Sequence, residues 1–205
     1  MSSMLERLAL GFVEKVISKG LHRKVLIDLG CGFGRWGHII RSSVDEGGHE
    51  VGMIGCDIFR PYLKATKEYN PYDDLICCDV RYLPFQERSV DIALAFEVIE
   101  HLRKKEGHDV LAHLLKICRD RVIVSTPSGR FSQGPTRQNE FERHVSSWTE
   151  KDFKKLGFAV SKYGLGVDLE LLCRRLHFYR FLYGFARLVH RDSWGGVMLI
   201  AERHR

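Results

Sequence analysis

Short apolar runs alternate with stretches of helical periodicity through the first two-thirds of the chain. The apolar runs are rich in β-branched residues and span 25–29, 51–57, 74–79, 90–96 and 121–126. The stretches with apolar side chains at helical spacing include 35–43, 60–69 and 103–118. Because buried strands that alternate with helices form parallel sheets covered on both faces, this order predicts an α/β fold.

The last third of the chain is predicted to complete the same sheet. A long loop, 127–148, leads to a short helix, and Thr149 with Asp152 has the capping-box pattern of a helix start. The runs 158–164 and 195–202 are predicted to be the last two strands.

No repeat, low-complexity tract or linker separates one part of the chain from another. At 205 residues the chain lies in the usual size range of one domain. We therefore predict a single domain over 1–205. Its parts are a leading amphipathic helix in 1–20, a core over 24–165 and a helical insertion over 168–193 between the last two strands.

The composition, with 44% hydrophobic and 28% charged residues, is that of an ordinary globular protein. No run approaches the roughly 20 apolar residues of a membrane-spanning helix, and the N-terminus lacks the pattern of a secretory signal. We therefore expect a cytoplasmic protein. The six cysteines are scattered without a CxxC pair, so we expect free thiols and no metal site.

A glycine-rich loop follows the first apolar run and opens the next helix. Its sequence is DLGCGFG, from Asp28 to Gly34. Glycines here allow a tight turn and let a ligand approach the backbone, while the N–H groups at the helix start can bind a ligand carboxylate. The glycine spacing alone is equally compatible with a nicotinamide or flavin dinucleotide.

Acidic residues also end the second and third apolar runs. Asp57 stands where a carboxylate can accept hydrogen bonds from both ribose hydroxyls of an adenosine. Asp79 stands where it can accept from an adenine amino group, beside the backbone of Val80. With Asp28, three carboxylates are predicted at successive strand ends, an arrangement that a solvated surface explains poorly.

These segments together resemble the class I S-adenosylmethionine-dependent methyltransferases, particularly the broad group that methylates small molecules. The resemblance covers about 24–165 and is carried by VLIDLGCGFGRWG, Asp57, Asp79 and the run DIALAFEVIEHL at 91–102. It implies a Rossmann-like, seven-stranded, mostly parallel sheet with helices on both faces and an antiparallel last strand. It also implies S-adenosylmethionine as the cofactor.

The resemblance further implies a role for each matching residue. The glycine loop would contact the methionine part of the cofactor, and Asp28 would brace that loop. The acids at the second and third strand ends would bind the ribose and the adenine, and Phe96 with Glu97 would lie near the sulfonium. The full set of implied cofactor residues is Asp28, Gly30, Cys31, Gly32, Gly34, Asp57, Ile58, Asp79, Val80, Phe96 and Glu97.

Methyl transfer from a sulfonium is an in-line displacement, so the protein's main tasks are to align donor and acceptor and to exclude water. A general base is optional and contributes roughly 100- to 10,000-fold where it is present. The candidate bases are Glu97 and His101, beside the expected methyl position, and His144 in the long loop. The alternatives are that His101 caps the following helix and that His144 is a surface residue.

The long loop leaves the carboxyl end of the fifth predicted strand, where it faces the cofactor site, and long loops at such positions are usually functional. Its NEFERHVSSWT stretch, which includes Trp148, is predicted to bind substrate or act as a lid. Arg143 and His144 would hold an anionic acceptor. The alternative is a solvated connector.

A basic, aromatic segment spans 169–191 and contributes to the net charge of +6. It has three interpretations. It is a helix that covers the substrate pocket or forms a dimer contact, an interfacial helix that takes a lipid-like substrate from a membrane, or an RNA-binding face. The last is the least favoured, because no recognised RNA-binding module accompanies it.

We therefore predict an enzyme that transfers a methyl group from S-adenosylmethionine to a small or lipid-like acceptor. The first alternative is an RNA methyltransferase. The second is a non-catalytic, S-adenosylmethionine-binding partner protein. The presence of all three strand-end carboxylates argues against this second alternative.

Overall fold

The computed structural model describes residues 23–46, 50–129, 133–135, 139–163 and 198–204. The predicted leading helix in 1–20 and the predicted insertion over 168–193 lie outside the described residues.

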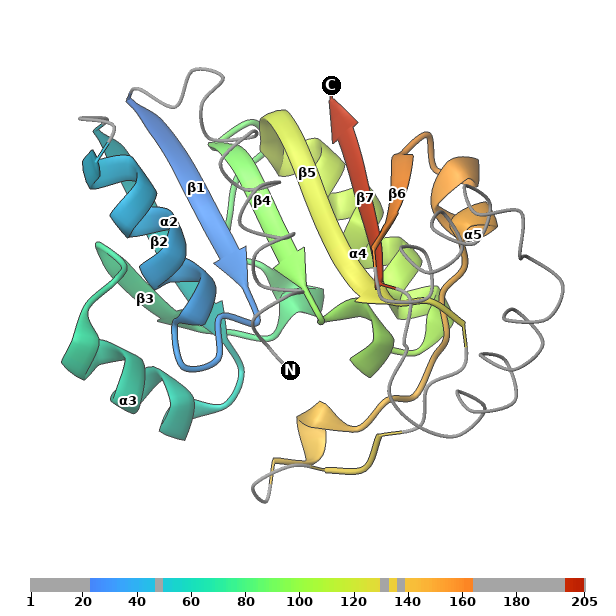
Figure 1. The fold of residues 1–205 in the computed structure, drawn as a ribbon, viewed down its shortest axis with the longest axis horizontal. Coiled ribbons are helices and arrows are strands. Elements are labelled where there is room, and N and C mark those ends of the chain that lie inside the picture. Colours follow the sequence, from blue (N-terminus) through green and yellow to red (C-terminus); the bar gives the residue numbers. More distant parts are fainter. Residues whose placement is uncertain (1–22, 47–49, 130–132, 136–138, 164–197, 205) are drawn as a thin grey trace, which may run out of the picture.

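Seven strands form one sheet in the order β3-β2-β1-β4-β5-β7-β6. The strands are β1 Lys24–Leu29, β2 Val51–Asp57, β3 Asp74–Cys77, β4 Val90–Phe96, β5 Cys118–Pro127, β6 Ala159–Tyr163 and β7 Met198–His204. β1 to β5 are parallel, whereas β7 is antiparallel to both of its neighbours, β5 and β6. This confirms the predicted Rossmann-like sheet with an antiparallel last strand, and Figure 1 shows β1, β4 and β5 ending at the same lower edge.

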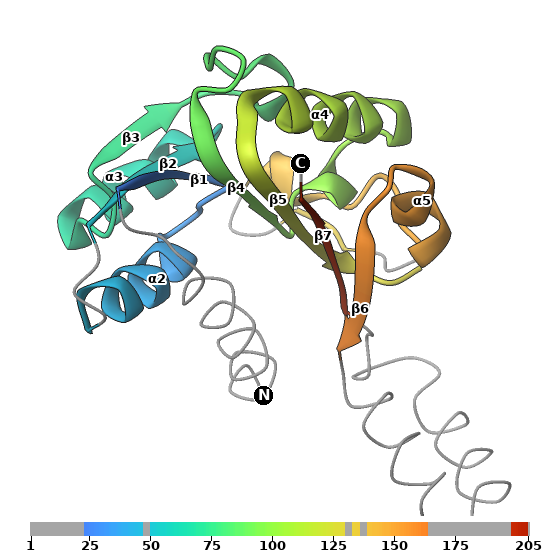
Figure 2. The same ribbon diagram turned by 90° about the horizontal axis from the view of Figure 1, so that it is seen from above.

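Helices cover both faces of this sheet. The helices are α2 Arg35–Glu46, α3 Arg60–Tyr69, α4 Lys104–Ile117 and α5 Glu150–Lys155, with the 3-10 turns η1 Val80–Tyr82, η2 Ile99–His101 and η3 Glu140–Glu142. α2 and α4 lie on opposite faces of the sheet (Figure 2). None of the helices in the described ranges is long and apolar enough to span a membrane.

Successive residues of the central strands point to opposite faces of the sheet and enter two different hydrophobic clusters. Leu26 of β1 packs in one cluster with Ile40 of α2. The next residue, Ile27, packs in the other cluster with Leu111 of α4. Because both faces are buried, the strands appear in the sequence as continuous apolar runs.

Several strand boundaries differ from the prediction by a few residues, including those of β3 and β5. β3 is shorter and ends at Cys77, because the carboxylate of Asp79 accepts a hydrogen bond from the N–H of Arg81 at 2.9 Å and starts η1 there. β5 is longer and extends to Pro127, which is paired with Met198 of β7. The capping box predicted at the start of α5 is present.

Trp148 belongs to the core and not to a substrate-binding surface, so that part of the loop prediction is wrong. Its side chain is fully buried, and its ring centroid lies 5.5 Å from that of Phe153. Its Nε1 donates to the carbonyl of Ile99 at 3.2 Å. Gly107 of α4 lies against the indole, where a larger side chain would clash. The end of the long loop is therefore anchored to α4.

A buried tyrosine holds the turn between β1 and α2. The hydroxyl of Tyr72 donates to the carboxylate of Asp28 at 2.5 Å and accepts from the N–H of Gly37 at 3.1 Å. A Cβ on Gly37 would lie 2.3 Å from the tyrosine ring. Burial raises the pKa of Asp28 to about 7, although the hydrogen bond from Tyr72 opposes this shift. The hydroxyl of Tyr72 thus joins β1, α2 and the segment after α3 at one buried point.

We expect Gly107→Ala to destabilise the protein by about 1–3 kcal/mol. Helix propensity alone predicts the opposite sign, because alanine stabilises a helix interior by roughly 1 kcal/mol relative to glycine. The added Cβ, however, would lie 2.4 Å from Cζ2 of Trp148. Urea denaturation measures the difference, with Gly134→Ala as the control because its Cβ would meet no atom within 4 Å. An unchanged or higher midpoint for Gly107→Ala would contradict the packing.

We expect Asp28→Asn to become progressively more stable relative to the wild type as the pH rises from 4 to 8. The folded pKa of Asp28 is about 7 against an ordinary value of 3.8, so the native state holds a proton that the unfolded state releases in this window. The free energy of unfolding of the wild type therefore falls with pH by up to about 1.4 kcal/mol per unit, and asparagine removes this slope. Denaturation curves at several pH values measure it.

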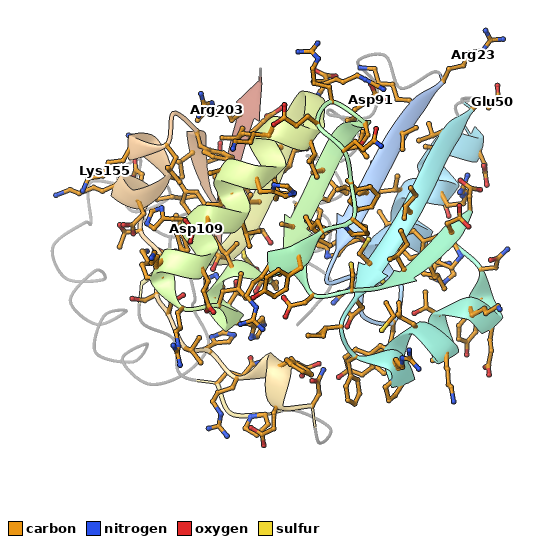
Figure 3. The ribbon with its side chains drawn as sticks, turned by 180° about the vertical axis from the view of Figure 1, so that it is seen from behind. Arg23, Glu50, Asp91, Asp109, Lys155 and Arg203 are labelled. Carbon is orange, nitrogen blue, oxygen red and sulfur yellow. The ribbon has the colours of Figure 1, made fainter. Side chains whose placement is uncertain are left out.

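The matched control for this experiment is Asp109→Asn, because Asp109 is exposed on α4 (Figure 3). Its stability profile should run parallel to that of the wild type. If Asp28→Asn also ran parallel to the wild type, the buried, protonated carboxyl would be disproved.

Candidate cofactor and acceptor site

The parallel strands end around a cavity of ≈ 650 Å³. This is within the range of about 300–1,000 Å³ that small-molecule sites occupy. Of the residues predicted from the sequence, those that line it are Gly30, Gly32, Asp57, Ile58, Asp79, Val80, Phe96, Glu97, His101 and Arg143. Four others that the structure also describes do not line it: Asp28, Cys31, Gly34 and His144.

The glycine loop forms one wall of the cavity with its backbone. Gly30 and Gly32 have φ angles of 65° and 54°, in the left-handed region that glycine adopts without strain. A Cβ on Gly30 would lie 2.6 Å from Cγ2 of Val98, so the loop also packs too closely against the segment after β4 for a larger residue. The loop therefore exposes main chain to the cavity.

Asp57 fixes the glycine loop while lining the same cavity. Its carboxylate accepts from the N–H of Gly32 at 2.9 Å and from the N–H of Phe59 at 2.7 Å. The carbonyl of Gly32 in turn accepts from the hydroxyl of Thr66 at 2.8 Å. Burial raises the pKa of Asp57, and the two backbone hydrogen bonds oppose that shift. The carboxylate is thus held in a defined orientation at the end of β2.

Asp79 is bound to an arginine that the sequence analysis did not include. Both of its carboxylate oxygens accept from the guanidinium of Arg81, at 2.6–3.0 Å, and these hydrogen bonds lower the pKa of Asp79. Arg81 also pairs with Glu106 of α4 at 2.9 Å. All three residues line the cavity, so the end predicted for adenine is a charged, hydrogen-bonded network.

The end of β4 supplies an aromatic and a carboxyl group to the cavity. Phe96 packs against Trp36 of α2, with 4.7 Å between the ring centroids. Glu97 follows with a φ of 55°, a left-handed conformation that is uncommon outside glycine and often marks functional positions. Its carboxylate accepts from the hydroxyl of Ser125 at 3.0 Å, and burial raises the pKa of Glu97 to about 7.

Two of the three candidate bases, His101 and His144, lie together. His101 lies against His144, with 4.9 Å between ring centroids, and its Nδ1 is 3.2 Å from the carbonyl of Arg143. Burial lowers the pKa of His101, which favours the neutral imidazole. Glu100, buried beside them, was not predicted. Its pKa is raised by burial and by the nearby charge of Glu97.

The proposal that His101 caps the next helix is wrong. α4 begins at Lys104 and its N-cap is Arg103, whereas His101 ends η2. The ring of His101 instead faces the cavity wall.

The long loop contributes more acidic and aromatic groups than basic ones. Arg143 lines the cavity, but its guanidinium pairs with Glu140 at 2.9 Å. The hydroxyl of Tyr62 on α3 donates to the carboxylate of Glu142, so the loop and α3 are joined by two residues that line the cavity. Lining residues that were not predicted from the sequence include Trp36, Tyr62, Arg81 and Gln133, whereas Asn139 and Glu142 belong to the stretch that was predicted to bind substrate. Arg81 lies only two positions from Asp79, whereas no local pattern identifies Trp36, Tyr62 or Gln133.

Comparisons with known proteins agree with this geometry. The sequence model of the methyltransferase domain family matches residues 26–121. An uncharacterised protein of Methanocaldococcus jannaschii is 23% identical over 136 residues, which are 66% of this chain and 55% of that protein. The chain thus spans about half the length of this curated relative.

Two solved structures share the fold. Magnesium protoporphyrin IX methyltransferase from Synechocystis, with bound S-adenosylmethionine, is 15% identical with a TM-score of 0.54, covering 95% of this chain and 79% of its own. A phosphoethanolamine N-methyltransferase of Haemonchus contortus, with bound S-adenosylhomocysteine, is 12% identical with a TM-score of 0.62, covering 96% and 52%. Their names give different acceptors, so the shared fold leaves the acceptor open.

The residues of the cavity suit S-adenosylmethionine. Gly30 and Gly32 expose main chain to the cavity, and Asp57 presents a buried carboxylate to the same space. The strand order of the sheet and the matched domain model agree with a cofactor site of this kind. Residues 26–121 of the chain match the methyltransferase domain family, and the residues of the cavity fit S-adenosylmethionine as the cofactor.

Proposed function

We propose that the chain transfers the methyl group of S-adenosylmethionine to a small or lipid-like acceptor. The observation that carries this proposal is the apolar rim of the cavity. Phe141 and Val145 line it from the long loop and remain 51% and 50% exposed. Large apolar side chains left in water beside a cofactor site favour an acceptor with an apolar part that enters from this side.

Bound S-adenosylmethionine supplies an activated methyl group on a sulfonium. The chain's own residues bind and orient: the glycine loop and Asp57 hold the cofactor, and the aromatic pair of Trp36 and Phe96 excludes water beside it. His101 is the group best suited to take a proton from a hydroxyl or amine acceptor, since it lines the cavity and burial favours its neutral form.

Three further statements are also proposals. The segment 169–191 lies outside the described residues. Contact with a membrane surface, RNA or a second copy of the chain would depend on this segment. RNA methylation is therefore kept as the alternative acceptor class, and a non-catalytic, cofactor-binding partner protein as the alternative to an enzyme. A cytoplasmic location is an expectation of the same kind.

We expect the purified protein to bind S-adenosylmethionine, and Asp57→Ala to weaken that binding by about 10- to 150-fold. The factor corresponds to the roughly 1.5–3 kcal/mol of hydrogen bonds to a charged group. Isothermal titration calorimetry measures both constants. Asp109→Ala, an exposed site on α4, is the matched control and should bind like the wild type. Equal affinity in Asp57→Ala, or preference for NAD, would refute the assignment of the site.

We expect radiolabel from the methyl group of S-adenosylmethionine to appear in a metabolite or lipid extract incubated with the protein. Phe141→Ala should reduce labelling roughly tenfold at limiting acceptor, because truncation removes about 1.5 kcal/mol of apolar contact. Tyr69→Ala is the control, since Tyr69 is 70% exposed but does not line the cavity.

The outcomes of the labelling experiment separate the alternatives. Label found in total RNA alone would exclude the small-molecule proposal in favour of RNA methylation. Cofactor binding without transfer into any extract would favour the non-catalytic partner protein.

A further inference from the structure

A carboxylate and two imidazoles meet behind the wall of the cavity, at the point where His101 lines it. One ligand atom each from Glu100, His101 and His144 lies within 4.8 Å of the others. Glu100 and His101 follow β4, whereas His144 is in the loop after β5. The main chain joins the two segments, because the carbonyl of Glu100 accepts from the N–H groups of Val145 and Ser146 at 2.9 and 3.0 Å. The cluster is thus fixed by backbone hydrogen bonds.

Glu100 is buried with one carboxylate oxygen unsatisfied. The residue is 2% exposed, and its Oε2 accepts from the hydroxyl of Thr126 at 3.0 Å. Its Oε1 has no hydrogen-bond partner among the described residues. A second buried carboxylate, that of Glu97, interacts with it electrostatically. Such an oxygen is costly to bury unless a proton or a cation satisfies it.

His101 has the hydrogen bond expected of a metal ligand. Its Nδ1 lies 3.2 Å from the carbonyl oxygen of Arg143. Because a carbonyl can only accept, Nδ1 carries the proton and Nε2 keeps its lone pair. Metal-binding histidines almost always use one ring nitrogen in this way, which fixes the tautomer and the orientation of the ring.

We propose that Glu100, His101 and His144 bind one divalent metal ion beside the cofactor. The scattered cysteines predicted no metal site, but this cluster contains no cysteine. Two imidazoles and one carboxylate suit zinc, manganese, iron or cobalt. In a tetrahedral site with bonds of about 2.1 Å, the ligand atoms lie about 3.4 Å apart, so binding requires them to approach one another by up to about 1.4 Å. The half-buried side chain of His144 can supply this movement by rotation.

A site with three protein ligands leaves at least one coordination position open. His101 lines the cavity, so this position faces the acceptor side. The ion therefore selects acceptors that carry an oxygen donor, such as a hydroxyl, and polarises that oxygen as a Lewis acid. With the ion bound, Nε2 of His101 is a ligand, so this polarisation replaces the general-base role proposed above for His101. This second step rests on the proposed methyl transfer, whereas the binding of the metal does not.

The test is metal binding by the full-length protein after removal of metal with a chelator. Cobalt(II) is the spectroscopic probe and zinc(II) the calorimetric one. We expect one ion per chain, visible absorption of cobalt typical of four- or five-coordinate sites, and at least tenfold weaker binding in Glu100→Gln and in His144→Ala. His38→Ala, an exposed histidine on α2, is the matched control and should bind like the wild type.

The two variants differ in their structural risk. Glu100→Gln changes a buried side chain, whereas His144→Ala changes a half-buried one, so the second variant keeps the test valid if the first fails to fold. The affinity of each variant for S-adenosylmethionine reports whether the cofactor site is intact. Absence of stoichiometric metal binding, or unchanged binding in His144→Ala, would overturn the inference.

The failure of this inference can be told apart from failure of the proposed function. Cofactor binding and methyl transfer that persist without any metal binding would remove only the metal. Metal binding without methyl transfer to any acceptor would leave the site but contradict the proposed function.

Discussion

Burial of both faces of the sheet determines where function can lie. Because α2 and α4 cover opposite faces, side chains in the middle of β1 and β4 are committed to packing. The chemistry is therefore confined to the strand ends and to the loops that follow them. The parallel direction of β1 to β5 brings five such ends to one edge, and the cavity forms there.

The glycine loop at that edge is held from two sides. Tyr72 and Asp28 fix its start from within the core, while Asp57 fixes Gly32 from the cavity side. Both residues are aspartates near the ends of neighbouring strands. Asp28 supports the loop from outside the cavity, whereas Asp57 lines the cavity. The glycine loop is thus preorganised for a ligand by hydrogen bonds within the protein.

The predictable part of the structure is the part encoded locally. Apolar periodicity located every strand of the parallel sheet, and the rule that ligands bind at carboxyl strand ends placed Asp57 beside the cavity. Contacts across the chain were not predictable. Trp148 stands at the end of a segment whose sequence predicts a loop. Its side chain is nevertheless buried against Gly107, which is 41 positions earlier in the sequence.

The acidic and histidine residues illustrate the same limit. The pairing of Asp79 with Arg81 is local and was open to inspection of the sequence. The meeting of Glu100 with His144 depends on the route of the long loop, which the hydrogen bonds from Val145 and Ser146 determine. A motif search that considers only short spacings cannot detect a cluster assembled in this way.

The antiparallel pair at the end of the sheet has a consequence for how this chain can diversify. Tyr163, the last residue of β6, is directly paired with Met198, the first residue of β7. The chain between them leaves and returns at neighbouring points, so its length and sequence are decoupled from the register of the sheet. The entropy of closing such a loop rises only with the logarithm of its length. Because its two ends lie side by side, a change in the length of the intervening chain adds little closure entropy and leaves the pairing of β6 with β7 unchanged.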